Sequence, residues 1–224
     1  DDNLETPKRF NSTINSKFHE STPVFTKDGK TMYFTRNNFL NGKRREDSKR
    51  VTLLKLYRST LVNGQWTSIK ELPFNSDNYS VAHPALSLDE KTLYFASDMP
   101  GTLGQSDLFK VTINEDDTYS IPENLGSKIN TEGRETFPMI SAENELYFAS
   151  DGRPGLGGLD IYVTRLDENQ NLGEIQNVGE PVNSPKDDFA FLINSETRKG
   201  FFTSNRDGGK GFDDIYKFTE TKKL

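Results

Sequence analysis

The side chains of this sequence that could do chemistry gather just before four apolar segments. These strand-start residues are His19, Glu20, His83, Arg134, Glu135, Asp187 and Asp188. A hydrolase triad needs a serine activated by a histidine, and a glycosidase needs two carboxyl groups facing one bond. No nucleophile motif accompanies either histidine, and acidic pairs of this kind typically stay solvated or link neighbouring units. We therefore predict no catalytic residue and interpret the strand-start residues as a polar surface that binds a partner.

A second set of candidates lies in Gly-rich turns such as SDGRPGLGGLDIY at 150–162. This turn has oxygen ligands at both ends but lacks the alternating acidic pattern that wraps calcium, and NRDGGKGFDD at 205–214 only approaches it. A phosphate cradle would need a helix after the glycines, which the sequence does not indicate. The aspartates that end these turns, Asp107, Asp160 and Asp214, are predicted to accept hydrogen bonds from their own turns. We predict no metal site and no cofactor.

These candidates occupy equivalent places in a fourfold repeat. The motifs YFTRN, YFASD, YFASD and FFTSN place a phenylalanine at positions 34, 95, 148 and 202. A second register ends in an aromatic residue at 57, 109, 162 and 216, and a third carries an asparagine at 15, 75, 130 and 183. The first unit is longer because of a polar excursion over 37–51, which we interpret as a mobile surface loop.

Each unit contains short alternating segments typical of strands and no helical period. Four short strands in about 50 residues indicate a β-propeller blade. The predicted fold class is all-β, a propeller of four-stranded antiparallel blades forming a single domain over 1–224. We expect blades at 19–79, with the insertion 37–51, at 80–131 and at 132–184, and three strands of a last blade at 185–224.

The first residues leave the closure of the ring open. Residues 5–18 match the outer strand and exit of a unit whose earlier strands are missing. This strand could complete the last blade and close a four-bladed ring. It could equally remain from a preceding blade of a five- or six-bladed ring, in a chain cut from a longer protein.

Composition narrows the classes of partner. A net charge of -6 argues against nucleic acid or an anionic membrane surface as the main partner. No apolar run is long enough to span a bilayer, and DDNLETPKRF is not a secretory leader. The absence of cysteine removes disulfides and thiolate chemistry. We expect a cytosolic protein, a mature exported protein or a piece of a longer chain.

The repeats resemble the TolB-like, WD-type propeller repeat of bacteria. The segments YFASDMPGTLGQSDLF, YFASDGRPGLGGLDIY and FFTSNRDGGKGFDDIY carry this likeness, whereas the first unit departs with Arg36 and Lys55. The phrases HESTPVFTKDGKTMYFTRNN and NLGSKINTEGRETFPMIS resemble the propeller segment of Bacteroidetes OmpA-family envelope proteins. That resemblance implies a periplasmic, outer-membrane-associated location. It also implies a link to type IX secretion or gliding, and attachment to peptidoglycan through a domain absent from this chain.

Two functions follow as expectations. The first is a protein-interaction scaffold without catalytic activity, whose partners are envelope proteins and which binds no nucleic acid and inserts into no membrane. The alternative is a propeller that binds or cleaves cell-wall or extracellular glycans.

Overall fold

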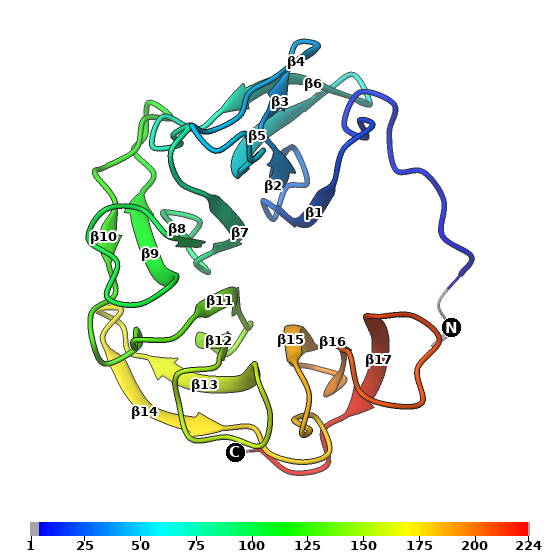
Figure 1. Cartoon of the computed structure of the whole chain (residues 1–224), viewed down its shortest axis with the longest axis vertical. Coiled ribbons are helices and arrows are strands. Elements are labelled where there is room, and N and C mark those ends of the chain that lie inside the picture. Colours follow the sequence, from blue (N-terminus) through cyan, green and yellow to red (C-terminus); the bar gives the residue numbers. More distant parts are fainter. Residues whose placement is uncertain (1–4, 224) are drawn as a thin grey trace.

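The structure is a computed structural model that describes residues 5–223, and its main strands form four antiparallel sheets around a common axis (Figure 1). The first sheet contains β1 (Glu20–Phe25), β2 (Thr31–Asn37), β5 (Leu54–Val62) and β6 (Gln65–Glu71). The second contains β7 (Val81–Leu86), β8 (Thr92–Ser97), β9 (Asp107–Thr112) and β10 (Glu123–Asn124). The third contains β11 (Glu135–Ile140), β12 (Glu145–Ser150), β13 (Asp160–Leu166) and β14 (Leu172–Asn177). The fourth contains β15 (Asp188–Asn194), β16 (Lys199–Ser204) and β17 (Asp214–Thr219).

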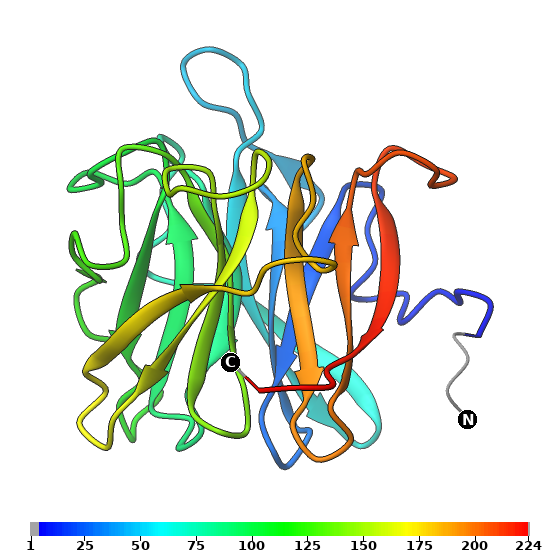
Figure 2. The same cartoon turned by 90° about the horizontal axis from the view of Figure 1, so that it is seen from below.

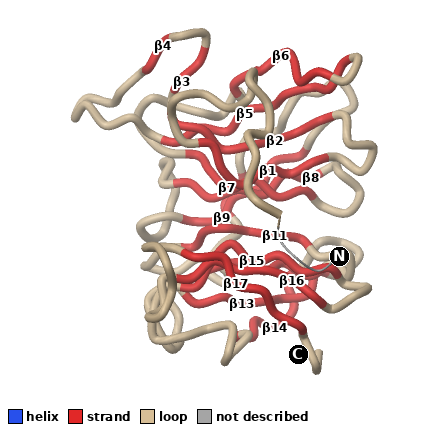
Figure 3. The backbone as a smooth tube through the Cα atoms, turned by 90° about the vertical axis from the view of Figure 1, so that its right-hand side faces the viewer, coloured by secondary structure: helices blue, strands red, loops and turns tan. Residues whose placement is uncertain are grey.

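These sheets confirm the predicted fold class: the chain is an all-β, four-bladed β-propeller, and we number its blades 1 to 4 in sequence order. The inner strands β1, β7, β11 and β15 surround the axis. Figure 3 shows strands and loops throughout residues 5–223 and no helix, so this part of the chain offers no helix that could cross a membrane. The hairpin of β3 (Phe39–Leu40) and β4 (Lys43–Arg44) extends blade 1.

Aromatic residues of the second strands fill the spaces between blades 1 and 2, blades 2 and 3, and blades 3 and 4. In blade 3, Tyr147 joins the core shared with blade 4, and Phe148 joins the core shared with blade 2. Blade 2 repeats the pattern, because Tyr94 faces blade 3 and Phe95 faces blade 1. Alternation along a strand turns successive side chains to opposite faces, so two adjacent aromatic residues serve two junctions. Complete burial of one such ring contributes about 1.5–3 kcal/mol.

Three of the four repeated asparagines, Asn75, Asn130 and Asn183, latch blades 1 to 3 to the loops that leave them. Asn130 accepts a hydrogen bond from the Leu108 backbone N–H at 2.8 Å and donates one to the Leu108 carbonyl at 3.0 Å. Asn183 does the same to Ile161, at 2.8 and 2.9 Å. The amide side chain thus satisfies the backbone N–H and shares the carbonyl with the backbone N–H of Leu125 or Val178. The asparagine register therefore marks a structural joint of the propeller.

Arginines form a second joint on the aromatic rings. The Arg153 guanidinium lies over Phe148 and Tyr162 and donates to the carbonyls of Lys128 and Ile129 in the preceding exit loop. Arg206 repeats this in blade 4 and Arg36 in blade 1. Blade 2 has Met99 in the corresponding turn, buried in the core.

Arg153→Met is expected to cost less stability than Arg153→Ala. Methionine keeps the apolar stem on the rings, as Met99 does in blade 2, and removes the buried Arg153 Nε, which has no hydrogen-bond partner. Alanine loses both packing and the cation–π contact, which together are worth about 1–2 kcal/mol. Urea unfolding of the two variants beside the wild type checks this order. Equal losses would show that hydrogen bonds to the carbonyls, and not packing, dominate the joint.

Blade 4 has the number of strands predicted from the sequence, whereas the N-terminal segment differs from the expectation. Blade 4 has three strands, and residues 5–19 contain a turn at 12–14 but no strand. The outer strand expected over 5–18 is therefore not formed. Its absence leaves the outer edge of β17 uncovered, and Ile215 is 65% exposed. The equivalent residues of the other blades, Leu56, Leu108 and Ile161, are at most 1% exposed.

Candidate functional site

The turns between second and third strands share one face of the propeller with the starts of the inner strands. Antiparallel pairing dictates this, because Ser97 at the end of β8 lies opposite Val81 at the start of β7. Figure 2 shows this face at the top, with the excursion of blade 1 rising above it. The two sets of candidates from the sequence therefore do meet on one face.

Most strand-start carboxylates on this face are engaged inside the protein. Glu135 is fully buried and accepts hydrogen bonds from the Thr131 backbone N–H at 2.8 Å and the Ser150 hydroxyl at 2.6 Å. Asp188, also fully buried, accepts from the Ser184 backbone N–H at 2.6 Å and from Arg206 at 2.7 Å. These two carboxylates tie the preceding exit loop to their own blade.

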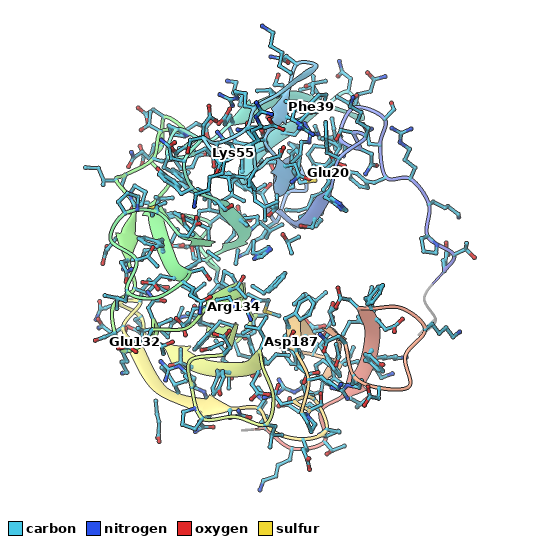
Figure 4. The ribbon with its side chains drawn as sticks, viewed as in Figure 1. Glu20, Phe39, Lys55, Glu132, Arg134 and Asp187 are labelled. Atoms are coloured by element: carbon cyan, nitrogen blue, oxygen red, sulfur yellow. The ribbon has the colours of Figure 1, made fainter. Side chains whose placement is uncertain are left out.

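Glu20 takes the same role in blade 1, with Arg36 as its partner at 2.9 Å. Asp187 is half-buried and accepts from the Leu159 backbone N–H at 2.8 Å. Arg134 pairs with Asp151 at 2.7 Å and remains 47% exposed. Figure 4 shows Arg134 and Asp187 beside the starts of β11 and β15.

The predicted turn aspartates bond to their own turns. Asp107 accepts from the backbone N–H of Leu103 at 2.7 Å, and Asp160 from that of Leu156 at 2.6 Å. Asp214 accepts from the N–H of Lys210 at 2.7 Å. Burial raises the pKa of Asp160, and its Oδ1 atom has no hydrogen-bond partner among residues 5–223. Among residues 5–223, no group of three or more histidine and acidic side chains is placed to hold a metal ion.

The two histidines have different surroundings. His19 is exposed on the upper face, whereas His83 lines an apolar cavity of about 270 Å³ on the axis. All four inner strands contribute to this axial cavity. Each strand has a bulge there, with one residue at positive φ: Thr22 at 45°, His83 at 57°, Phe137 at 50° and Ala190 at 52°. A bulge leaves its extra residue outside the ladder, so these four side chains belong to the cavity and not to the sheets.

Aromatic stacking dominates the axial cavity. The His83 ring stacks on Phe137 with 3.7 Å between centroids, and Phe137 contacts Phe189 at 4.9 Å. The imidazole Nδ1 also lies 2.7 Å from the Thr136 hydroxyl. Sequence reasoning named His83 but missed the two phenylalanines. The available signal was the residue before each repeated proline, at positions 22, 83 and 137.

Acidification is expected to destabilise the fold through His83. Its burial against Phe137 lowers the pKa of His83 from 6.5 to about 3. In the unfolded chain the His83 imidazole is protonated below about pH 6.5, whereas in the folded chain it is protonated only below about pH 3. The contribution of the neutral, buried imidazole to stability is therefore complete above pH 6.5 and is lost as the pH falls from 6.5 toward 3. The free energy of unfolding of wild type should therefore exceed that of His83→Asn by less at pH 4.5 than at pH 7.5, as measured by urea unfolding. Asparagine is the chosen replacement because it tolerates positive φ. A pH-independent difference would contradict the assignment.

Blade 1 carries the most distinctive polar cluster, which we call the hairpin base. Lys55 stands where the other blades have aspartate, is 1% exposed, and contacts Glu71 at 2.9 Å and Asp77 at 2.6 Å. Asn38 is 1% exposed and donates to Asp77 at 2.7 Å, and Arg45 pairs with Glu71. The hydrogen bond from Lys55 holds the pKa of Asp77 below its usual range.

This cluster explains why the first unit departs from the repeat at several positions together. The hairpin of β3 and β4 stands on the hairpin base, and Phe39 packs against Phe18 with 4.8 Å between ring centroids. Beyond the hairpin, Asp47 accepts from the backbone N–H groups of Lys49 and Val51, both at 2.8 Å. The excursion is therefore a projection that contains a hairpin, and its root is bonded to the hairpin base.

The projection is basic although the protein is acidic. Residues 43–50 contain five basic and two acidic side chains in a chain of net charge -6. Arg44 and Arg45 pair with acidic residues, whereas Lys43, Lys49 and Arg50, which we call the tip residues, are exposed. This charge pattern makes the tip attractive to an acidic surface.

Comparisons with known proteins identify the fold but no family. Models of protein families found no match to this sequence, and no curated protein matches it. An alpha-L-arabinofuranosidase from Lactobacillus brevis is similar in structure, with a TM-score of 0.57 and 15% identity over 89% of this chain and 72% of that chain. A puromycin-hydrolyzing peptidase from Mycobacterium tuberculosis has a TM-score of 0.53 and 14% identity over 91% of this chain and 28% of its own. The neighbours also include a putative TolB from Agrobacterium tumefaciens, at a TM-score of 0.47 and 15% identity over 84% of this chain and 71% of that chain.

These similarities correct the prediction that the chain is not an enzyme. That prediction rested on the repeat and on the lack of a catalytic constellation in the sequence, and it was wrong because the same fold occurs in the arabinofuranosidase and the peptidase. At 14 and 15% identity the likeness itself shows the fold alone.

Proposed function

We propose that this propeller is a protein-interaction module that docks an acidic partner through the projection of blade 1. The observation that carries the proposal is the hairpin base. Burying a lysine with two carboxylates costs desolvation free energy. The other blades have serine and aspartate at the positions of Arg36 and Lys55, and they form without such a cluster. The cluster instead fixes the root of an exposed basic tip, which is what a docking element needs.

The resemblance of the sequence to OmpA-family propellers supplies the setting of the proposal. It favours a periplasmic protein associated with the outer membrane, with envelope proteins as partners and a connection to type IX secretion. In that setting, peptidoglycan would be bound by a domain absent from this chain, and the propeller would present its upper face to the partner. An acidic partner fits the positive tip residues.

Charge reversal at the tip tests this function. Lys43→Glu, Lys49→Glu and Arg50→Glu combined leave the hairpin base untouched. A matched control reverses three exposed lysines elsewhere, Lys27, Lys30 and Lys70. Affinity capture from an envelope extract, followed by mass spectrometry, should recover a salt-sensitive partner with wild type and control, at least tenfold depleted with the tip variant. Equal recovery with all three proteins, or no specific partner with any, would refute the proposal.

A glycan-binding or glycan-cleaving propeller is the second candidate, and the axial cavity is the observation that favours it. Ligand cavities are lined by apolar and aromatic groups with a few polar atoms, as this one is by Phe137, His83 and Thr22. Calorimetry with a panel of cell-wall fragments should then give binding that Phe137→Ala weakens at least tenfold. Release of products from the same panel would show cleavage, and no heat with any fragment would exclude this candidate.

A further inference from the structure

The ring has three packed junctions and one open seam. The junctions between blades 1 and 2, 2 and 3, and 3 and 4 each contain a cluster of buried apolar side chains drawn from both blades. The fourth cluster of the described residues is confined to blade 1 and the segment before it. No core cluster among residues 5–223 joins blade 4 to blade 1.

Both sides of this seam are apolar and exposed. On the blade 4 side, Ile215 is 65% and Leu192 is 56% exposed. On the blade 1 side, Phe10 is 55% and Phe25 is 41% exposed, above an apolar cavity of about 270 Å³. Each of these exposures is large for a propeller, in which closure normally removes free edges and faces.

The N-terminal segment already contains half of a blade junction. Ile14 is 4% exposed and packs on blade 1, as Ile129 packs on blade 3. Glu20 accepts from the Ser16 backbone N–H at 3.1 Å, repeating the bond from Thr131 to Glu135. Asn15 stands in the latch register, yet its side chain accepts from the nearby Asn11 N–H, at 3.0 Å, and not from Ile215. The latch asparagine is therefore present, but it is not bonded to β17, the third strand of blade 4.

We propose that residues 5–10 are a strap that closes the ring by pairing with β17 as the fourth strand of blade 4. The repeat fixes the register. In blade 3, Asn177 lies six residues before the latch Asn183 and pairs with Tyr162. The same count from Asn15 places Arg9 opposite Tyr216, Lys8 opposite Lys217 and Pro7 opposite Phe218. In Figure 1 the segment already runs along the open side of the ring, between blade 1 and blade 4.

The sequence of the strap suits this register. In blade 3 the Val178 N–H donates to the Ile161 carbonyl, and hydrogen-bonded pairs alternate with non-hydrogen-bonded pairs along an antiparallel ladder. Ile175 and Thr164 therefore form a non-hydrogen-bonded pair, and the ladder does not use the Ile175 N–H. Pro7 is equivalent to Ile175, which is where a strand accepts proline. Phe10 is equivalent to Val178, which packs against the core of blades 3 and 4, so closure would bury Phe10 on blade 4.

One pair of the proposed register is unfavourable in charge. Lys8 would face Lys217 directly, and like charges directly opposite in a ladder are destabilising. The same position of blade 2 carries Lys110 and Glu123, which form an ion pair at 3.5 Å. Lys8→Glu would therefore recreate the blade 2 arrangement and shift the chain toward the closed ring.

Disulfide trapping tests the strap directly. The chain has no cysteine, and both Lys8 and Lys217 are exposed, so Lys8→Cys/Lys217→Cys should fold normally and oxidise without competing thiols. Paired strand positions lie within disulfide reach. We expect an intramolecular cross-link in monomeric protein, seen as faster migration in non-reducing electrophoresis and a mass loss of two hydrogens. Thr6→Cys/Ile215→Cys, four residues out of register, is the control and should cross-link at least tenfold more slowly.

Three outcomes would overturn the strap. They are equal rates for the two cysteine pairs, no cross-link, or only intermolecular dimers, in which a second copy supplies the strand. Hydrogen exchange on cysteine-free protein provides an independent measurement. Lys8→Glu should slow exchange of the β17 amides at least fivefold relative to Lys8→Gln, and unchanged exchange would also count against closure.

Discussion

Replacing Asn130 by alanine is expected to lower the free energy of unfolding by about 2 kcal/mol. It leaves the buried N–H of Leu108 unpaired and removes one of two hydrogen bonds to the Leu108 carbonyl, which keeps the Leu125 N–H. The side chain is 2% exposed, and it is the partner of both the N–H and the carbonyl of Leu108. Leu108 lies in the core between blades 2 and 3, where water cannot readily replace the lost partner. Urea unfolding, with the slope of the transition compared between proteins, measures the loss.

Asn114→Ala is the matched control for this latch. Asn114 is exposed, and its side chain donates to the Thr118 hydroxyl at 2.8 Å. The same substitution there should cost less than about 1 kcal/mol, since water replaces the bond. Equal losses at the two positions would mean that the latch contributes no more than an ordinary turn.

Lys55→Asp is expected to cost about 4 kcal/mol, even though it restores the residue found at the equivalent position of the other three blades. Substitutions toward a repeat consensus commonly stabilise a protein. Here the new carboxylate would face Glu71 and Asp77 without the cation that both now contact. The root of the hairpin should loosen as well, so faster hydrogen exchange over residues 38–53 is expected beside the lower unfolding midpoint.

Lys110→Asp provides the comparison for this charge change. Lys110 pairs with Glu123 at 3.5 Å, and the glutamate side chain is 69% exposed. Exposed pairs of this kind contribute at most about 1 kcal/mol. If Lys55→Asp proved as mild as Lys110→Asp, the hairpin base would be an ordinary surface network, and the main support for the docking proposal would disappear.

The fold could be predicted from the sequence because its information is local and repeated. An aromatic pair such as Tyr147 and Phe148 specifies a strand with two buried faces, and four spaced copies specify four blades. The same logic identified Asp107, Asp160 and Asp214 as residues of their own turns. Their short polar side chains reach nearby backbone N–H groups whatever the rest of the molecule does.

The candidate site was less accessible to such reasoning because it depends on contacts between distant segments. Glu135 and Asp188 look like surface groups in the sequence, and only the docking of the preceding exit loop buries them. Phe137 and Phe189 lie in different blades, and no local pattern shows that they meet at the axis. The hairpin base joins Lys55 to Asp77, a pairing that the sequence presents only as two departures from a repeat.

The bulges of the inner strands give the axial cavity an unusual independence from the scaffold. Each blade contributes one positive-φ residue, and these residues differ completely: threonine, histidine, phenylalanine and alanine. None of the four takes part in the strand ladder, so exchanging one alters the cavity without rewriting the pairing around it. The four residues can therefore be exchanged one at a time, and variation or engineering can change the shape and polarity of the axial cavity while the blades stay the same.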